Sequence, residues 1–243
     1  MSQISKIEWT QLTWNPTTGC TKISDGCKFC YAERLSKRLK AMGVDAYSDG
    51  FEVSIHPERL DQPLKRKKPS IYFINSMSDL FHKNIPDDYI VQVFEVVKKA
   101  NYHIFQLLTK RPKRMFEFCN QITVPDNLWV GVTVENKFEG IPRINYLRKI
   151  KASIRFISFE PLLEDIGLLN LDGIKWVIVG GESGPNGRRM NQEWVINIKN
   201  QCDHNHIPFF FKQWGTWDKH GIKGSKKKNG RSLLGKIWDE YPN

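Results

Sequence analysis

The stretch IYFINSMSDLFHKNIPDDYIVQVFEVVKKANYHIFQLLT, residues 71–109, contains two short apolar runs separated by a longer segment of helical character. The runs at 71–75 and 103–109 are rich in β-branched and aromatic residues, as buried strands are. Residues 86–100 begin with proline and aspartate and then place apolar residues three and four positions apart, which predicts a helix. A strand, a helix and a second strand in this order form a right-handed unit with parallel strands.

The same alternation extends over most of the chain. Further apolar runs lie at 128–134, 154–159, 174–180 and 207–213, and further helical segments lie at 31–42, 112–122, 140–150 and 191–205. The segment IEWTQLTW, residues 7–14, is a weaker candidate for a first strand. We therefore predict an α/β fold with a parallel sheet, either open and doubly wound or curled into a barrel. In both cases ligands bind at the carboxyl ends of the strands.

Composition and charge limit the class of protein. The 243 residues include 37 Lys and Arg against 26 Asp and Glu, a net charge of +11, and 40% are hydrophobic. These values exclude a disordered tail or a coiled coil. The chain lacks an apolar run long enough for a membrane span and a signal peptide at its start, so we expect a cytoplasmic protein with no membrane contact. The basic excess, concentrated at 65–68 and 223–231, favours a polyanionic partner.

Polar residues follow each of the six clear strands. They are Ser76, Ser78 and Asp79, then Thr109 and Lys110, then Thr133 and Glu135, then Glu160, then Glu182 and Ser183, and finally Lys212 and Gln213. Because the carboxyl ends of parallel strands meet at one edge, these side chains are expected to line a common pocket. The alternative for Ser78 and Asp79 is that they cap a turn or a helix.

Three of the five cysteines lie within eleven residues, in GCTKISDGCKFCYAERL at 19–35. Cys20, Cys27 and Cys30 form a CxxxxxxCxxC pattern, whereas Cys119 and Cys202 stand alone in helical segments. This pattern in a chain without a secretion signal favours metal or cluster chemistry over disulfides. A structural zinc site needs a fourth ligand, for which His56, His82, His204 and His206 are the candidates. A [4Fe-4S] cluster with one iron open to S-adenosyl-L-methionine (SAM) needs only the three thiolates.

The cysteine loop resembles that of the radical SAM superfamily. An aromatic residue, Phe29, directly precedes Cys30, and the loop comes before the first full helix of a parallel α/β fold. The common loop of that superfamily has three residues between its first two cysteines, whereas six residues separate Cys20 from Cys27.

A closer resemblance covers nearly the whole chain. In order, the motifs IEWTQLTWNPTTGCTKISDGCKFCYAERL, FEVSIHPERLDQPL, INSMSDLFH, FQLLTKRPKRM, VGVTVEN, FISFEPLLEDI, VIVGGESG, FFFKQWGTW and GRSLLGKIWDEYP are similar to a phage-associated family of unknown function. That family is generally placed among radical-SAM-like barrels and has a remote similarity to spore photoproduct lyase, a DNA repair enzyme. The resemblance implies a partial TIM-like (β/α) barrel over residues 1–215, with an N-terminal cysteine loop, and a basic C-terminal extension over 216–243.

The resemblance also implies roles for individual residues. Cys20, Cys27 and Cys30 would bind the [4Fe-4S] cluster, which Phe29 would shield from solvent. Ser76, Ser78 and Asp79 would hold the amino group of SAM, Thr133 and Glu135 its ribose hydroxyls, and Gly180, Gly181 and Glu182 its adenine or carboxylate. Glu160 and Lys110 are expected to serve catalysis, and Lys110, Arg111 and Lys212 would neutralise the SAM carboxylate or bind a substrate phosphate. A glycine pair after a strand also fits a simple tight turn.

These expectations together describe a radical SAM enzyme. Such an enzyme generates a 5′-deoxyadenosyl radical, here to modify or repair a nucleic acid base of DNA or RNA, the substrate class that the basic charge and the phage association favour. It would need an external electron donor, and a partner protein is compatible with the small size of the extension. Two alternatives stay open: a non-catalytic nucleic-acid-binding protein stabilised by zinc or a cluster, and a radical enzyme that acts on a peptide or small molecule.

Overall fold

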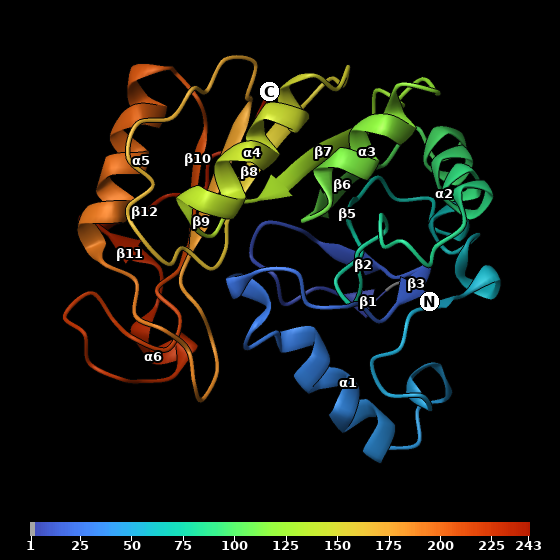
Figure 1. Cartoon of the computed structure of the whole chain (residues 1–243), viewed down its shortest axis with the longest axis horizontal. Helices are drawn as coiled ribbons and strands as arrows, with labels where there is room; N and C mark the ends of the chain where they lie inside the picture. Colours follow the sequence, from blue (N-terminus) through green and yellow to red (C-terminus); the bar gives the residue numbers. More distant parts are fainter. Residues whose placement is uncertain (1–2) are drawn as a thin grey trace.

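The computed structural model describes residues 3–243 and contains one curved sheet of eight strands (Figure 1). Its order is β1 (Gln3–Ile4), β2 (Leu12–Trp14), β5 (Ile71–Ile74), β6 (Ile104–Thr109), β7 (Leu128–Thr133), β8 (Arg155–Phe159), β9 (Trp176–Gly180) and β10 (Phe209–Gln213). The strands β2 and β5–β10 are parallel, and only β1 runs antiparallel to its neighbour. Because each new strand is added on the same side of the last, the sheet curls in one direction. The result is the partial TIM-like barrel of the sequence prediction and not a doubly wound sheet.

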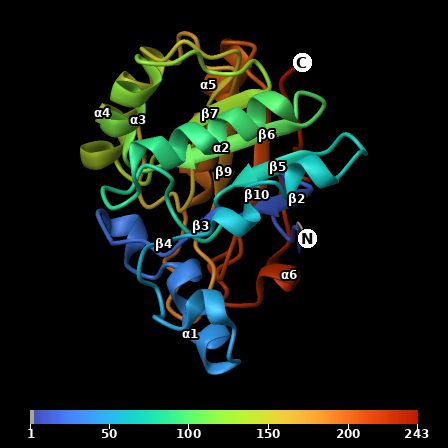
Figure 2. The ribbon, with the colours of Figure 1, turned by 90° about the vertical axis from the view of Figure 1, so that its right-hand side faces the viewer.

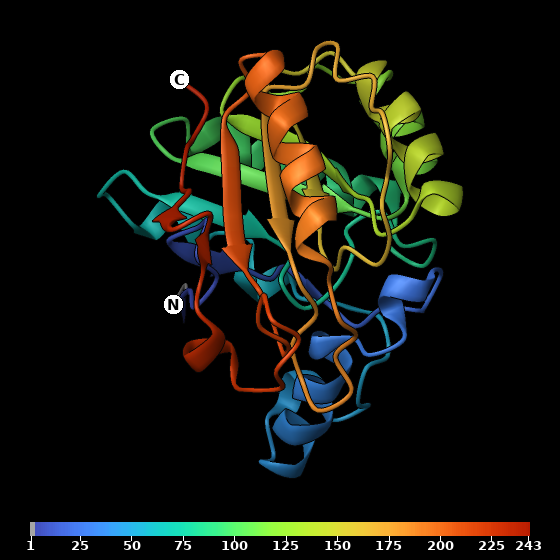
Figure 3. The same cartoon turned by 90° about the vertical axis from the view of Figure 1, so that its left-hand side faces the viewer.

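The helices that connect the strands cover the outer face of the sheet. They are α2 (Asp87–Lys99), α3 (Pro112–Cys119), α4 (Lys137–Arg148) and α5 (Gln192–His204), and Figures 2 and 3 show α2 over β6 and α5 over β9 and β10. The first turn of α2 contains two aspartates and its last turn two lysines, which suits the helix dipole. The helix α4 begins three residues earlier than predicted because the Asn136 side chain accepts a hydrogen bond from the Glu139 N–H and caps it.

The inside of the barrel is filled with aromatic rings at the amino ends of the strands. Trp129, Phe156, Trp176 and Phe210 lie there, together with Trp9. Gly131 is required in this packing because a Cβ at that position would lie 2.6 Å from the Phe156 ring. Space inside the barrel therefore remains only toward the carboxyl ends of the strands, which point to the end of the molecule where α1 (Tyr31–Ala41) and α6 (Lys226–Asn229) lie (Figure 3).

The last residues of the described chain pack along β10. The backbone of Phe211 donates to the Trp238 carbonyl at 2.9 Å, and the Tyr241 ring stacks on Trp176 with centroids 5.1 Å apart. A small hairpin of β11 (Ser232–Leu233) and β12 (Lys236–Ile237) precedes these contacts. The segment thereby covers backbone groups that an edge strand would expose.

A separate two-stranded antiparallel sheet lies next to the cysteine loop, and the sequence did not predict it. It pairs β3 (Thr17–Thr18) with β4 (Ser54–Ile55). Short 3-10 turns at Asp25–Cys27, Asp45–Tyr47, Pro57–Arg59 and Pro63–Lys65 complete the secondary structure of this half. Within residues 3–243, none of the helices has the length and apolar character needed to cross a bilayer.

Candidate functional site

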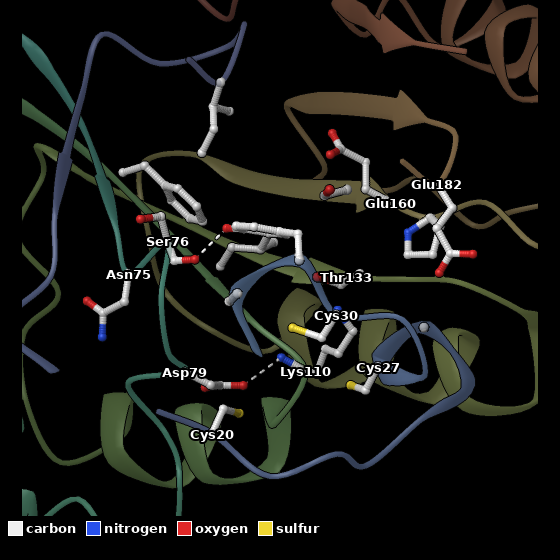
Figure 4. A pocket seen from close by; sticks show the side chains of 18 of the residues that line it. Cys20, Cys27, Cys30, Asn75, Ser76, Asp79, Lys110, Thr133, Glu160 and Glu182 are labelled. Carbon is white, nitrogen blue, oxygen red and sulfur yellow. Dashed lines mark hydrogen bonds between the residues drawn. The ribbon is translucent and has the colours of Figure 1, made fainter. Parts of the chain in front are cut away.

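A cavity of about 340 Å³ opens at the carboxyl ends of the strands (Figure 4). It brings together most of the residues predicted for the site: Cys20, Cys27, Phe29, Cys30, Ser76, Ser78, Asp79, Lys110, Thr133, Glu160 and Glu182. Strand ends from β5 to β10 and the cysteine loop all contribute to the lining, as the parallel topology predicts. The predicted residues Glu135, Gly180 and Gly181 lie beside the cavity and not in its lining.

Local backbone geometry fixes the three cysteines around this cavity. Gly19 has a φ of +80°, and a Cβ there would lie 1.9 Å from the Glu52 carbonyl oxygen, so only glycine fits before Cys20. Cys27 ends a 3-10 turn, and Cys30 is the N-terminal capping residue of α1. All three thiols are free. The N-terminus of a helix favours negative charge, which suits a thiolate at Cys30.

Cys20 is held by a charged pair from the neighbouring strands. Arg111 Nη1 donates to Cys20 Sγ at 3.4 Å and to Asp79 Oδ2 at 2.9 Å. Burial, and after it the Asp79 carboxylate, raise the pKa of the Cys20 thiol to about 11, against the opposing effect of Arg111. Cys20 is therefore a neutral thiol at neutral pH in the protein without a bound metal.

Asp79 has more partners than the sequence indicated. Besides Arg111, its carboxylate accepts hydrogen bonds from the backbone N–H groups of Phe81 (3.0 Å) and Lys110 (3.1 Å) and from the Thr109 hydroxyl (2.7 Å). It thus caps a turn, as in the alternative that the sequence left open, and it also faces the cavity. Its carboxylate orients Arg111 toward the cysteine loop.

Glu135 contacts the cysteine loop on the side that faces the end of β7. It is fully buried, pairs with Arg143, lies 3.6 Å from Lys110 Nζ, and accepts a hydrogen bond from the Ser24 hydroxyl at 2.6 Å. Gly26 lies directly above it, and a Cβ on Gly26 would come within 2.4 Å of the Glu135 side chain. The direct effect of Glu135 is therefore on the position of the loop.

The glycine pair at the end of β9 allows close packing of protein segments. A Cβ on Gly181 would lie 2.0 Å from the Trp214 carbonyl oxygen, whereas a Cβ on Gly180 would meet the side chains of Glu160 and Lys212 at 3.3 and 3.4 Å. Glu160 and Lys212 form an ion pair of 2.5 Å across the ends of β8 and β10. The two glycines therefore allow close packing between the ends of β8, β9 and β10.

Unpartnered buried polar atoms gather in the cavity wall. Among residues 3–243, the buried side-chain nitrogen and oxygen atoms without a hydrogen-bond partner include Trp9 Nε1, Asn75 Oδ1, Ser158 Oγ, Glu160 Oε1 and Gln213 Oε1, all from residues that line the cavity. Each such atom costs about 1–3 kcal/mol if it stays unpaired. The clustering of donors and acceptors here is what a site for a polar ligand requires.

Sequence reasoning missed several residues around the site, and two of them connect its elements. The Tyr31 hydroxyl donates to the Ser76 carbonyl, which joins α1 to the end of β5 (Figure 4). Arg188 pairs with Glu182 at 2.6 Å, donates to the Asp25 carbonyl at 3.0 Å and places its guanidinium over the Phe29 ring at 5.4 Å. Tyr31 directly follows Cys30, a signal that the sequence offered, but the position of Arg188 in a loop gave none.

The residues around the cavity fit an iron–sulfur cluster in type and number, because three thiols of one loop face the same space. Within the described part of the chain, no three Cys, His, Asp or Glu side chains converge closely enough to hold a single metal ion. The thiolates of a cluster bind different iron atoms and so stand further apart than the ligands of one ion. Of the histidines considered for zinc, His82 contacts Thr21 Oγ1 at 2.9 Å and His56 contacts Thr18 Oγ1 at 2.8 Å.

His204 and His206 lie at the end of α5, away from the cysteine loop. Because α5 returns from the carboxyl ends of the strands to their amino ends, its last turn lies at the opposite end of the barrel from the cavity.

Comparisons with known proteins give a family and several solved structures of similar fold. A cysteine-to-serine variant of spore photoproduct lyase is 12% identical, with a TM-score of 0.49, over 83% of this chain and 63% of that chain. A second variant of that enzyme, with bound AdoMet and a dinucleoside spore photoproduct, is 11% identical with a TM-score of 0.49 and the same coverage. The chain thus spans less than two thirds of the length of these structures.

Among the curated proteins, none matches the sequence. A family model described as "Protein of unknown function (DUF5131)" matches residues 4–242, which is nearly the whole chain. The chain belongs to this family of proteins of unknown function.

Proposed function

We propose that the chain is a radical SAM enzyme in which Cys20, Cys27 and Cys30 bind a [4Fe-4S] cluster and the cavity binds SAM. The observation that carries the proposal is the meeting of three free thiols from one loop with a cavity wall that contains unpartnered buried polar atoms. A loop that supplied three thiolates and left one iron open would place the bound SAM inside this cavity. When bound, the cluster and SAM together supply a 5′-deoxyadenosyl radical that removes a hydrogen atom from a substrate.

The chain's own residues offer complementary contacts for SAM. Asn75 Oδ1 and Glu160 Oε1 are buried acceptors without partners, so they suit the ammonium group. The sequence assigned Asp79 to the SAM ammonium group. The Asp79 carboxylate already accepts four hydrogen bonds, so in this proposal Asn75 binds the ammonium group together with Asp79. Arg111, which faces Cys20, suits the carboxylate. Ser76, Ser78, Thr133 and Glu182 lie in the same wall as candidates for the remaining polar contacts.

The apolar part of the lining serves to exclude water. Trp9, Phe29, Tyr31, Phe51 and Phe73 all face the cavity. A reactive radical needs such protection, because water-filled sites allow side reactions. The Arg188 guanidinium lies over the Phe29 ring and holds it in place, so Arg188 covers this part of the cysteine loop.

The substrate class that the charge favours is a nucleic acid base, since the chain has a net charge of +11. DNA modification or repair is the form of this activity that we propose. The reaction needs an external electron donor, and a partner protein that completes the site is compatible with the proposal. A peptide or small molecule as substrate is the alternative within the same chemistry.

The decisive experiment is anaerobic reconstitution with iron and sulfide, followed by reduction in the presence of SAM. We expect about four irons per chain and formation of 5′-deoxyadenosine, both lost in Cys27→Ala. The matched control is Cys119→Ala, a buried cysteine outside the cavity, which should keep both properties. Zinc uptake without iron or SAM cleavage would contradict the proposal and favour a metal-stabilised nucleic-acid-binding protein.

A further inference from the structure

Three segments around the mouth of the cavity carry a net charge equal to that of the whole chain. Residues 21–43, 183–191 and 215–231 contain 14 Lys and Arg and only 3 Asp and Glu, a net charge of +11. The rest of the chain contains 23 residues of each sign and is neutral. The three segments, which we name the basic rim, therefore account for the whole charge excess.

The basic rim is one continuous surface. Arg188 donates to the Asp25 carbonyl at 3.0 Å and so joins the first two segments. The Trp217 indole donates to the Gly187 carbonyl at 2.7 Å and joins the second and third. Each segment also lines the cavity, through Cys27, Ser183 and Lys226 respectively. Figure 1 shows the two helices of the rim, α1 and α6, at the same end of the molecule.

The charges of the rim are available to a partner. Lys223, Lys227 and Lys228 are exposed, and the ion pairs of residues 3–243 involve none of them. On the first segment, Arg34, Arg38 and Lys40 are also exposed. Exposed lysines that are not neutralised by a carboxylate of the same chain are available to bind phosphates.

We propose that the basic rim binds the phosphate backbone of a single-stranded nucleic acid and presents one of its bases to the cavity. This inference rests on the proposed function for its chemistry, although binding itself needs no cluster. An acidic protein would match the rim alone. A nucleic acid strand matches both features, because its phosphates suit the rim and its bases carry the donors and acceptors that suit the cavity wall. A base in a duplex hides those groups and must first leave the stack.

The test compares two pairs of adjacent exposed lysines at opposite ends of the barrel. Lys227→Gln/Lys228→Gln removes two charges from the rim, and Lys67→Gln/Lys68→Gln removes two charges just before β5, at the amino ends of the strands. Binding of a fluorescent single-stranded DNA of roughly 20 nucleotides is measured against salt, on the full chain with and without reconstitution. Equal thermal midpoints establish that both variants fold.

We expect the rim variant alone to lose affinity. Two lost phosphate contacts reduce the salt slope by about 1.4, so between 50 and 200 mM salt the wild type should lose about sevenfold more affinity than the rim variant. An oligonucleotide of the same length with abasic sites should bind more weakly than the intact strand.

Equal effects of the two variants would overturn the proposal. So would polyglutamate of matched charge that competes as well as the oligonucleotide, because the rim would then suit an acidic protein. The iron and SAM-cleavage assays test the proposed function, whereas the binding assay tests the basic rim, so the two can fail independently. A chain without iron or SAM cleavage would still show the rim-dependent binding.

Discussion

Gly180 and Gly181 are neighbours at the end of β9, but their missing side chains face different surroundings. Gly181 lies against a backbone carbonyl of residue Trp214, which cannot move without displacing the turn after β10. Gly180 lies against the flexible side chains of Glu160 and Lys212. The turn after β10 can approach β9 this closely because residue 181 carries a hydrogen atom in place of a Cβ.

We expect Gly181→Ala to lower the free energy of unfolding by about 3 kcal/mol, because its Cβ would overlap the Trp214 carbonyl oxygen. Gly180→Ala is the matched control and should cost less than about 1 kcal/mol, since its neighbours can shift. Urea denaturation of both variants measures the difference. Similar costs for the two substitutions would show that the close approach at Gly181 is not a constraint.

At the scale of elements, His103 connects the start of β6 to the segment that precedes β5. Its Nδ1 accepts a hydrogen bond from the Ser70 N–H at 3.1 Å, and its Nε2 donates to the carbonyls of Pro63 and Arg66, both at 3.1 Å. The ring is buried, which favours its neutral form in the folded chain. The amino ends of two adjacent strands are thus fixed by one imidazole.

The neutral state of His103 makes stability depend on pH. Burial lowers its pKa below 6.5 in the folded chain, so between the two pKa values the unfolded chain binds more protons. Its contribution is complete above pH 6.5 and is lost as the pH falls through the folded pKa. We expect His103→Asn to cost about 1–2 kcal/mol at pH 8 and to flatten the loss of stability as the pH falls below 6.5.

The exposed His220 provides the control for this prediction, and His220→Asn should leave the pH profile unchanged. Chemical denaturation at a series of pH values measures both variants. An unaltered profile in His103→Asn would mean that the ring does not titrate as its burial requires.

Most elements that position the site could be predicted from the sequence, and the reasons are physical. Buried parallel strands such as β6 and β9 are mostly apolar, and the helices between the strands keep an apolar spacing of three and four. Because ligands of parallel α/β folds bind at the carboxyl ends of the strands, the sequence also predicted where the cavity lies. The short β3, β4, β11 and β12 could not be predicted, because elements of two residues depend on tertiary contacts.

The finer arrangement of the site also depends on contacts that no local pattern encodes. Glu135 follows β7 as predicted, but its direction is set by Arg143 and the cysteine loop. Arg188 reaches the loop only because the segment after β9 folds back over Phe29. Spacing in the sequence identified the strand ends correctly but could not show which side chains already have partners.

At the scale of the whole molecule, the residues after β12 pack against β9 and β10 of the partial barrel. Tyr241 lies between Trp176 and Phe210, with centroid distances of 5.1 and 5.6 Å. These rings close the end of the barrel opposite the cavity. The two ends of the barrel are thus built differently, one sealed by aromatic packing and the other open and charged.

We expect Tyr241→Ala to lower the free energy of unfolding by about 2 kcal/mol, because it removes aromatic packing and leaves Trp176 exposed. Ile237→Ala, in the same segment but 52% exposed, should change stability by less than about 0.5 kcal/mol. Thermal and urea denaturation measure both variants. A Tyr241→Ala protein as stable as the wild type would contradict a sealing role for the segment.

The basic rim concentrates a net charge of +11 around the cavity mouth, which makes the electrostatic potential of the molecule strongly positive there. In the field of a polyanion such a molecule rotates before it makes contact, so that the cavity mouth faces the partner. This orientation acts over about one Debye length, roughly 8 Å at physiological salt. Collisions would then be productive more often than those of a uniformly charged sphere, and this advantage would disappear as salt is added.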